Sequence, residues 1–222
     1  MTNKITFTDI KNSQEVRTYI KQADASLAVM GFTEHSFAHA TKCAEVAGGL
    51  LKDLGYSDHD VELAKIAGYT HDIGNVINRA DHAQSGAVMA FRLLDKMGMA
   101  AEDTATVITA IGNHDEKTAF PVNAVAAALI IADKTDVRRS RVRNRETIYS
   151  DIHDRVNYAV EKSDLVLDKE NKTLTLYLTI DTEISAVMDY FEIFMERMLL
   201  SRRAADFLGL SFKLSINGNG IM

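Results

Sequence analysis

The sequence is poor in the residues that cross-link or interrupt a chain. Its single cysteine, Cys43, excludes a disulfide bond within the chain and is typical of a reducing compartment. A single proline and the lack of low-complexity tracts leave no obvious linker between separate domains. With 222 residues, 46% of them hydrophobic, the chain is long enough for one large domain or for a domain with a smaller appendage.

Long apolar stretches are also missing. The longest wholly apolar run, Ala124 to Ala132, is far shorter than the roughly 20 residues that a membrane-spanning helix needs. The N-terminal segment MTNKITFTDIKNSQE is polar and mixed in charge, without the apolar core of a signal peptide. We therefore expect a cytoplasmic protein with no membrane segment.

The chain has no overall excess of positive charge. Its formal net charge of −6 argues against general affinity for nucleic-acid polymers. Positive charge is nevertheless concentrated at Arg138, Arg139, Arg141, Arg143 and Arg145. This run has two interpretations: a solvated helix end, or a phosphate-binding patch, because the guanidinium fork matches phosphate oxygens.

Helical periodicity dominates from about Ser13 to Glu161, where apolar residues mostly recur at helical spacing. Glycine follows several of these runs, as it commonly does at helix ends. The pattern predicts helices over Glu15–Met30, Phe37–Leu54, Asp58–Asp72, Gln84–Met97, Ala101–Asn113, Val122–Arg141 and Thr147–Glu161.

The pattern changes after Ser163. Apolar and polar residues alternate over Leu165–Leu167 and again over Thr173–Ile180. The intervening residues 168–172 are polar and resemble a turn, so the segment predicts a β-hairpin.

A long helix over Glu183–Leu208 and a strand over Ser211–Ile216 are predicted next. We expect the hairpin and this last strand to form a small antiparallel sheet. The sequence therefore predicts a mainly α fold, with a helical domain over residues 1–162 and a small α+β segment over residues 163–222.

Six polar residues stand out against this apolar background: His39, His71, Asp72, His82, His114 and Asp133. Each histidine taken alone is explained as an ordinary core or surface residue. Asp133 lies within the apolar segment LIIADKTD, where an unpaired carboxylate would carry a large desolvation cost. It therefore requires a cation or several hydrogen-bond donors. Imidazole and carboxylate together suit Mn, Fe, Co, Ni or Zn ions.

The order of these residues, H…HD…H…H…D, resembles the HD superfamily of metal-dependent phosphohydrolases. The segments that carry the resemblance are HATKCAEVA, AGYTHDIGN, DHAQSGA, AIGNHDE and ALIIADKTDVRRSR, within residues 30–145. The complete ordered set is far more specific than an HD dipeptide. The resemblance implies a helical bundle fold and hydrolysis of phosphate compounds.

The resemblance also implies a ligand set for two divalent transition-metal ions. One metal would take His39, His71, Asp72 and Asp133. The second would add His82 and His114, with Asp72 bridging both ions as the central catalytic residue. The short gap between the HD pair and His82 is most similar to the bacterial hydrolases that split diadenosine tetraphosphate symmetrically.

This sequence departs from the family pattern at a position that contacts the substrate in other members. After HDIG the family often has a lysine that reaches a substrate phosphate, whereas this sequence has Asn75. Arg138, Arg139 and Arg141 are expected on the same helix as Asp133, one to two turns further on. We therefore predict that these arginines contribute the phosphate contacts, and we include His35 and Asn75 with them as candidate substrate-binding residues.

His35 stands one turn before His39, where some members of the superfamily have a carboxylate that binds a third metal. Three interpretations remain open for His35: a metal ligand, a substrate contact, or a partner of His39.

The resulting hypothesis is hydrolysis of a phosphoester or phosphoanhydride in a small nucleotide or phosphorylated metabolite by a hydroxide bridging the two metals. Bulk nucleic acid and membranes are not expected partners, and a homodimer stays open. Two alternatives use the same residues. One is a di-iron pair that activates O₂, and the other is a non-catalytic sensor that binds a nucleotide.

Overall fold

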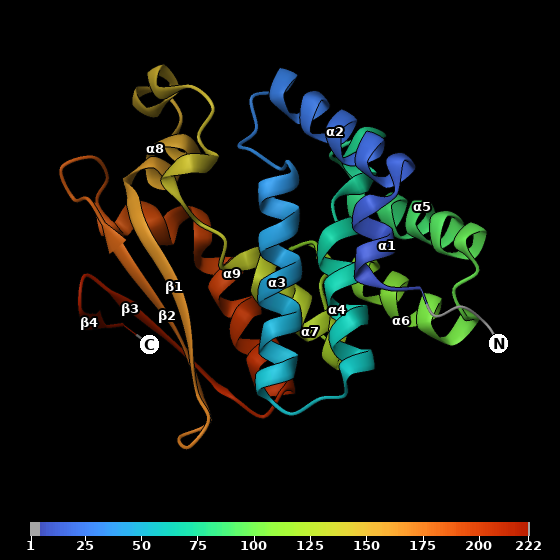
Figure 1. Cartoon of the computed structure of the whole chain (residues 1–222). Helices are drawn as coiled ribbons and strands as arrows, with labels where there is room; N and C mark the ends of the chain where they lie inside the picture. The colour runs from blue at the N-terminus through green and yellow to red at the C-terminus, as the bar shows by residue number, and fades with distance from the viewer. Residues whose placement is uncertain (1–4, 222) are drawn as a thin grey trace.

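Helices make up most of the chain, and a small sheet lies along one side (Figure 1). The computed structural model describes residues 5–221, with the side chain of Thr147 left out. The α-helices are α1 (Phe7–Asn12), α2 (Gln14–Val29), α3 (Phe37–Asp53), α4 (Asp58–Thr70), α5 (His82–Met97), α6 (Ala101–Gly112), α7 (Ala124–Lys134), α8 (Ile152–Ala159) and α9 (Val187–Phe207). Short 3₁₀ helices are η1 (Ile73–Val76), η2 (Arg139–Arg141) and η3 (Arg145–Tyr149). Between residues 5 and 221, no helix combines the length and apolar character needed to cross a bilayer.

The strands are β1 (Val160–Asp168), β2 (Thr173–Ile180), β3 (Ser211–Ile216) and β4 (Asn219–Gly220), in the spatial order β1-β2-β3-β4. The mainly α fold with a small C-terminal sheet and a long helix is therefore confirmed. β1 and β2 form the predicted antiparallel hairpin. β2 and β3, however, pair in parallel, so an antiparallel position for the last predicted strand was wrong. The reason is α9, which connects the two strands as a crossover helix and returns the chain in the same direction.

Helix α7 lies at the centre of the molecule and packs on both sides. Ala128 and Leu129 contact the core formed by α1 to α6. Ile130 and Ile131 belong to a second core with α9 and the inner face of the sheet. Burial on all sides explains why the run Ala124 to Ala132 is wholly apolar. The division into residues 1–162 and 163–222 stays a prediction.

Close packing of α4 against α3 depends on Gly68. A Cβ atom at this position would lie 2.8 Å from the backbone of Ala44. The absence of a side chain lets the two helices approach closely, which brings His39 on α3 near the C-terminal end of α4.

The predicted helix over Val122–Arg141 is too long, because α7 ends at Lys134. Arg138 has extended backbone, with φ −163° and ψ 147°, and Arg139 and Arg141 lie in the separate helix η2. The placement of these arginines on the helix of Asp133 was therefore wrong. The chain leaves the helix because the carboxylate of Asp136 turns inward, to a site described below.

The predicted helix over Thr147–Glu161 is also shorter in the structure. α8 begins after Asp151, whose carboxylate accepts hydrogen bonds from the backbone N–H groups of His153 and Asp154. Val160 and Glu161 already belong to strand β1.

Candidate metal centre

The HD pair lies where α4 ends and η1 begins. His71 caps the C-terminus of α4, and Asp72 precedes the first residue of η1. Gly74 permits this turn to pack tightly against α5. A Cβ atom at Gly74 would overlap the carbonyl oxygen of His82 and lie 2.5 Å from the backbone nitrogen of Gly86. The tight packing brings Asp72 beside His82, the first residue of α5.

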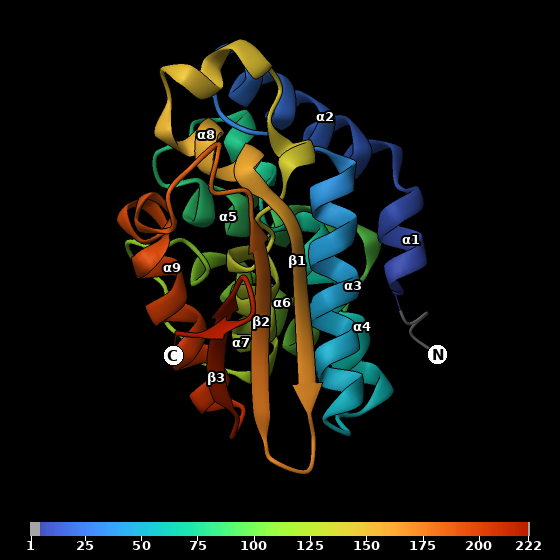
Figure 2. The same cartoon turned by 90° about the vertical axis from the view of Figure 1, so that its left-hand side faces the viewer.

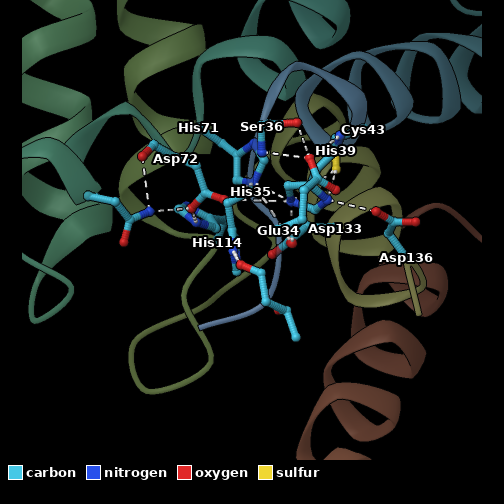
Figure 3. Close-up of polar contacts among 12 residues, drawn as sticks. Glu34, His35, Ser36, His39, Cys43, His71, Asp72, His114, Asp133 and Asp136 are labelled. Atoms are coloured by element: carbon cyan, nitrogen blue, oxygen red, sulfur yellow. Dashed lines mark hydrogen bonds and ion pairs between the residues drawn. The ribbon is translucent and has the colours of Figure 1, made fainter. Parts of the chain in front are cut away.

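All six predicted ligand residues come together (Figure 3 labels five of them). The Nε2 atoms of His39 and His71 are 3.3 Å apart, and Asp133 Oδ1 lies 3.4 Å from the Nε2 atom of His39. The Nε2 atoms of His82 and His114 are 3.2 Å apart and form a second group. α3, α4, α5 and α7 and the residues after α6 therefore contribute to one cluster.

Asp72 lies between the two groups. Its Oδ2 atom is 3.3 Å from His71 Nε2 and 3.6 Å from His39 Nε2. Its Oδ1 atom faces the other way, 3.5 Å from His82 Nε2 and 4.0 Å from His114 Nε2. One carboxylate oxygen is thus directed at each group, which is the geometry of a bridging ligand.

Each of the four histidines uses its Nδ1 atom for a hydrogen bond away from the cluster. The Nδ1 atoms of His71, His82 and His114 face the backbone carbonyl oxygens of Gly68, Arg79 and Ile111, at 2.8, 3.1 and 2.6 Å. A carbonyl oxygen can only accept, so Nδ1 carries the proton and a neutral ring has its lone pair on Nε2. His39 follows the same pattern with a carboxylate partner, because its Nδ1 lies 2.8 Å from Asp136 Oδ2.

This arrangement fits metal ions. Burial lowers the pKa of His82 and His114, so both rings are neutral near pH 7. Their facing Nε2 atoms are then both acceptors, which a cation between them would satisfy. Asp72 Oδ2 is likewise buried without a hydrogen-bond donor among residues 5–221. Within the same residues, the ligand-bearing atoms of His71, Asp72 and His114 lie within 4.8 Å of one another, as do those of His39, Cys43, His71 and Asp133.

The carboxylates of the cluster stay ionised. Burial alone would raise the pKa of Asp72, but the positive charge of His71, whose own pKa Asp72 raises against the effect of burial, outweighs it and holds the pKa of Asp72 well below its usual range. Asp133 is similar: Lys134 and His39 outweigh the effect of burial and lower its pKa strongly. Two anionic carboxylates beside histidine rings whose Nε2 atoms face the cluster form a ligand set for divalent transition metals.

The comparison with known families agrees with this geometry. The family model described as "HD domain" matches residues 34–159, which is more than half of the chain. The chain belongs to the HD domain family. HD domains bind divalent metals, and proteins with this domain are generally metal-dependent hydrolases.

Two relatives of this HD domain protein are similar over only part of their length. An uncharacterized protein of Methanocaldococcus jannaschii is 24% identical over 162 residues, which cover 63% of this chain and 62% of the relative. Ribonuclease Y 1 of Pediococcus pentosaceus is 34% identical over 119 residues, which cover 52% of this chain and 20% of the relative. The chain thus spans less than two thirds of either relative.

A cavity of about 320 Å³ opens beside the cluster of the HD domain. Asp72, His82 and Asp133 lie in its wall, together with the predicted substrate residues His35 and Arg141. Other charged or polar lining residues were not predicted from the sequence: Arg79, Glu116, Lys134, Asp151, His153, Asp154, Asn157 and Arg197. For His153 the sequence offers only acidic neighbours, Asp151 and Asp154, which are equally typical of an exposed helix face.

His35 lines this cavity next to His39 of the histidine and aspartate cluster. Its Nδ1 atom lies 2.7 Å from the carbonyl oxygen of Thr33, and its ring packs edge-on against His39 with 5.4 Å between centroids. Burial strongly lowers the pKa of His35, so its ring is neutral near pH 7. Contact with His39 and exposure to the cavity leave the three interpretations of His35 open.

Arg138 and Arg139 point away from the cavity. Arg138 binds Asp136 through Nε at 2.9 Å and reaches Glu34 at 3.2 Å. Arg139 Nε donates to the carbonyl oxygen of Tyr158 at 2.6 Å. Arg141 lines the cavity but also donates to the backbone carbonyl oxygens of Glu34 and Asp136. Substrate binding by these arginines stays a prediction. The hydrogen bonds of Arg138 and Arg141 to Glu34 connect the loop before α3 to the residues after α7.

Asn75 does not line the cavity. Its side-chain amide donates to Asp72 Oδ1 at 2.9 Å and so fixes the orientation of this carboxylate. Arg79, four residues further on, reaches the cavity instead, and its guanidinium group lies 3.9 Å from Asp72 Oδ1. The sequence signal that could have identified Arg79 was the loss of the family lysine at Asn75, which leaves a place for a cation one turn later.

Cys43 lies against His39. Its sulfur is 3.7 Å from Nδ1 and 3.6 Å from Nε2 of that ring. Nearly equal distances to both nitrogens place the sulfur over the face of the imidazole, rather than along the direction in which Nε2 would bind a metal. Cys43 is completely buried and belongs to the hydrophobic core.

Proposed function

We propose that this chain is a phosphohydrolase that uses two divalent transition-metal ions to cleave a phosphoester or phosphoanhydride in a small nucleotide or phosphorylated metabolite. The observation that carries the proposal is the position of Asp72, with one carboxylate oxygen toward each group of histidines. Membership of the HD domain family supports the reaction class.

The proposed ligands divide between two ions. His39, His71, Asp72 and Asp133 would bind one, and His82, His114 and Asp72 the other. Bound there, the ions would supply Lewis acidity toward phosphoryl oxygens and lower the pKa of a water molecule toward neutrality. The hydrogen bonds at the Nδ1 atoms keep all four rings in the orientation that this binding requires.

The cations that line the cavity would orient the substrate. Arg79 and Arg141 line the cavity, and Lys134, which also lines it, lies beside Asp133. Guanidinium and ammonium groups in a largely enclosed site bind phosphate oxygens and offset the charge that develops on them during transfer. The cavity volume suits a small ligand, since pockets for such molecules begin at roughly 300 Å³.

The proposed substrate class is supported by the net charge of the chain and by the name of one relative. One relative is named a ribonuclease, which fits cleavage of a phosphoester. The net charge of −6 argues against a long nucleic-acid substrate. The motif spacing shared with symmetrical diadenosine tetraphosphate hydrolases makes a dinucleoside polyphosphate part of the proposal. The cytoplasmic location and the open question of a homodimer stay predictions.

The test combines metal content with phosphate release from a panel of nucleotides and simple phosphate esters. Wild-type protein should retain about two transition-metal ions per chain and release phosphate. Asp72→Ala should lose turnover by a factor of about 10³ or more, with less than two ions retained. Asp95→Ala, an exposed carboxylate on α5, is the matched control and should change neither measurement.

Metal retention without hydrolysis of any panel member would contradict the proposal and favour the oxygen-activating alternative. Protein that retains no metal and hydrolyses nothing would contradict it as well, leaving a binding protein.

A further inference from the structure

The C-terminal helix α9 contributes to the wall of the cavity, although it lies outside the region that matches the HD domain family. Phe194 and Arg197 of α9 line the cavity, whereas the family match ends at residue 159. α9 packs beside α7, the helix that carries Asp133 (in Figure 2, α7 lies behind the strands and α9 at their left). The appendage therefore places side chains within the candidate active site.

Arg197 is held in a defined orientation. Its Nε atom lies 2.7 Å from Glu116 Oε1, and its guanidinium carbon lies 4.6 Å from the centroid of the Phe194 ring. These two contacts use the Nε side and one face of the guanidinium group. Within residues 5–221, the hydrogen bonds and ion pairs of Arg197 use Nε alone, so its two terminal nitrogens are available to a ligand.

Glu116 is in contact with two cations of the cavity wall. Its Oε1 atom is shared by Arg197 and by Lys134, whose Nζ lies 3.3 Å away. Lys134 is only 4% exposed, so solvent screens its ammonium charge little.

Among residues 5–221, the other carboxylate in contact with Lys134 is that of Asp133, at 2.7 Å. Lys134 and Arg197 are therefore balanced by Glu116 and Asp133 when no metal is bound. Asp133 is also a proposed metal ligand. With its charge shared with an ion, Lys134 and Arg197 would carry excess positive charge within the same cavity as the metal cluster.

We propose that Arg197, supplied by the C-terminal appendage, binds a second anionic group of the substrate next to the phosphoryl group at the metals. This inference rests on the proposed function. It assigns the preferred substrates to molecules with two adjacent phosphoryl groups, such as nucleoside diphosphates and other phosphoanhydrides. Arg197 then determines specificity, and Glu116 and Phe194 position it.

The test measures binding rather than turnover. Affinities of inorganic pyrophosphate and of inorganic phosphate for the Mn²⁺-loaded protein are measured by calorimetry. Arg197→Gln should weaken pyrophosphate binding by about tenfold or more, because a charge-assisted hydrogen bond is lost. The affinity for phosphate should change by less than about threefold, since one phosphoryl group occupies only the metals. Arg202→Gln, an exposed arginine on the same helix, is the matched control and should alter neither affinity.

Equal loss of affinity for both anions, or no loss for either, would overturn the inference and leave Arg197 with a purely structural role. If Arg197→Gln does not fold, Arg197→Lys provides the same comparison, because lysine retains the charge toward Glu116 but lacks the fork. Loss of selectivity for pyrophosphate is again the expected result, and unchanged selectivity overturns the inference.

Failure of the proposed function gives a different pattern. A protein that binds pyrophosphate through Arg197 and hydrolyses nothing would overturn the proposed function alone. A protein that hydrolyses phosphoanhydrides equally well with and without Arg197 would overturn only the inference about Arg197.

Discussion

The carboxylate of Asp136 is completely enclosed, and a histidine N–H group and several cations surround it. Its carboxylate receives His39 Nδ1 at 2.8 Å, Lys42 at 3.0 Å and Arg138 at 2.9 Å. Burial alone would raise the pKa of Asp136, but these partners and Arg141 outweigh it and hold this pKa well below its usual range. A fixed negative charge behind His39 keeps the proton on Nδ1 and the lone pair on Nε2, facing the cluster (Figure 3).

We therefore expect Asp136→Asn to weaken metal binding while leaving every proposed ligand in place. The loss should be about 10- to 100-fold, as for other partners of metal-binding histidines. Competition with a chromophoric chelator for Mn²⁺ or Zn²⁺ measures it directly. Asp95→Asn is the control, and an unchanged affinity in Asp136→Asn would show that His39 is oriented by its packing alone.

The residues of the cluster could be predicted from the sequence because their order along the chain forms a specific motif. Their partners could not. Asp136 and His39 are 97 positions apart, and no local pattern relates them. Arg138 and Arg141 illustrate the same limit: their type favours phosphate binding, whereas their observed partners are Glu34 and Asp136. Which anion an arginine meets depends on the tertiary fold.

At the scale of elements, the turn between α4 and α5 is the part of the site that tolerates an added side-chain atom least. Gly74→Ala should destabilise the protein by about 2 kcal/mol or more, because the added Cβ meets backbone atoms of α5 that cannot move independently. It should also reduce metal retention, since Asp72 and His82 are positioned by this contact.

Gly49→Ala is the matched control for that substitution. Gly49 lies within α3, and a Cβ atom there would have no neighbour within 4 Å. We expect it to stabilise the protein by about 0.4–1 kcal/mol, because alanine loses less backbone entropy in a helix. Urea unfolding of both variants measures the difference, and similar effects in the two would exclude close packing at Gly74 as the cause.

Tyr190 on α9 predicts a pH dependence. Burial raises its pKa far above the ordinary value of a tyrosine, with only a partial opposing effect from Arg197. The native state therefore keeps the proton at a pH where the unfolded chain loses it, and the stabilisation is present below about pH 10 and is lost above it. Between pH 8 and pH 11, the free energy of unfolding should fall more steeply in wild type than in Tyr190→Phe.

The steepest additional slope expected from one such group is about 1.4 kcal/mol per pH unit. At pH 7 the substitution should cost within about 1 kcal/mol, because it removes only a hydrogen bond from the hydroxyl group to Met198 Sδ. Urea unfolding over this pH range is the measurement. Parallel pH profiles for the two proteins would show that Tyr190 titrates normally in the native state.

The ends of elements were harder to predict than the elements themselves. The helix over Val122–Arg141 was extended too far because its apolar periodicity gives no sign of where a buried charge draws the chain inward. Asp136 does so two residues after α7 ends at Lys134. The parallel pairing of β2 with β3 was missed because alternation defines a strand but not its neighbour or its direction.

For the whole molecule, metal binding at the cluster should raise the free energy of unfolding. Four Nε2 atoms and two carboxylates face one another in a buried volume, so an ion that binds only the folded chain stabilises it. Free Mn²⁺ at about 100 times its Kd should add about 2.7 kcal/mol per independent site to the free energy of unfolding. A chelator should remove this increment and lower Tm.

The same titration with Asp72→Ala is the control, because a variant without the proposed bridge should show at most a small part of the increment. An equal response to Mn²⁺ in wild type and Asp72→Ala would place the stabilising ion elsewhere in the protein.

The crossover formed by β2, α9 and β3 has a consequence for biosynthesis. A ribosome makes the chain from its N-terminus, so every proposed metal ligand emerges before α9, and α9 emerges before the strand that secures its far end. The proposed ligands are therefore complete in the nascent chain while the wall that carries Arg197 is still missing. In the order of synthesis, the ligand set for metal comes first, and the side chain that we propose for distinguishing one phosphoryl group from two comes later.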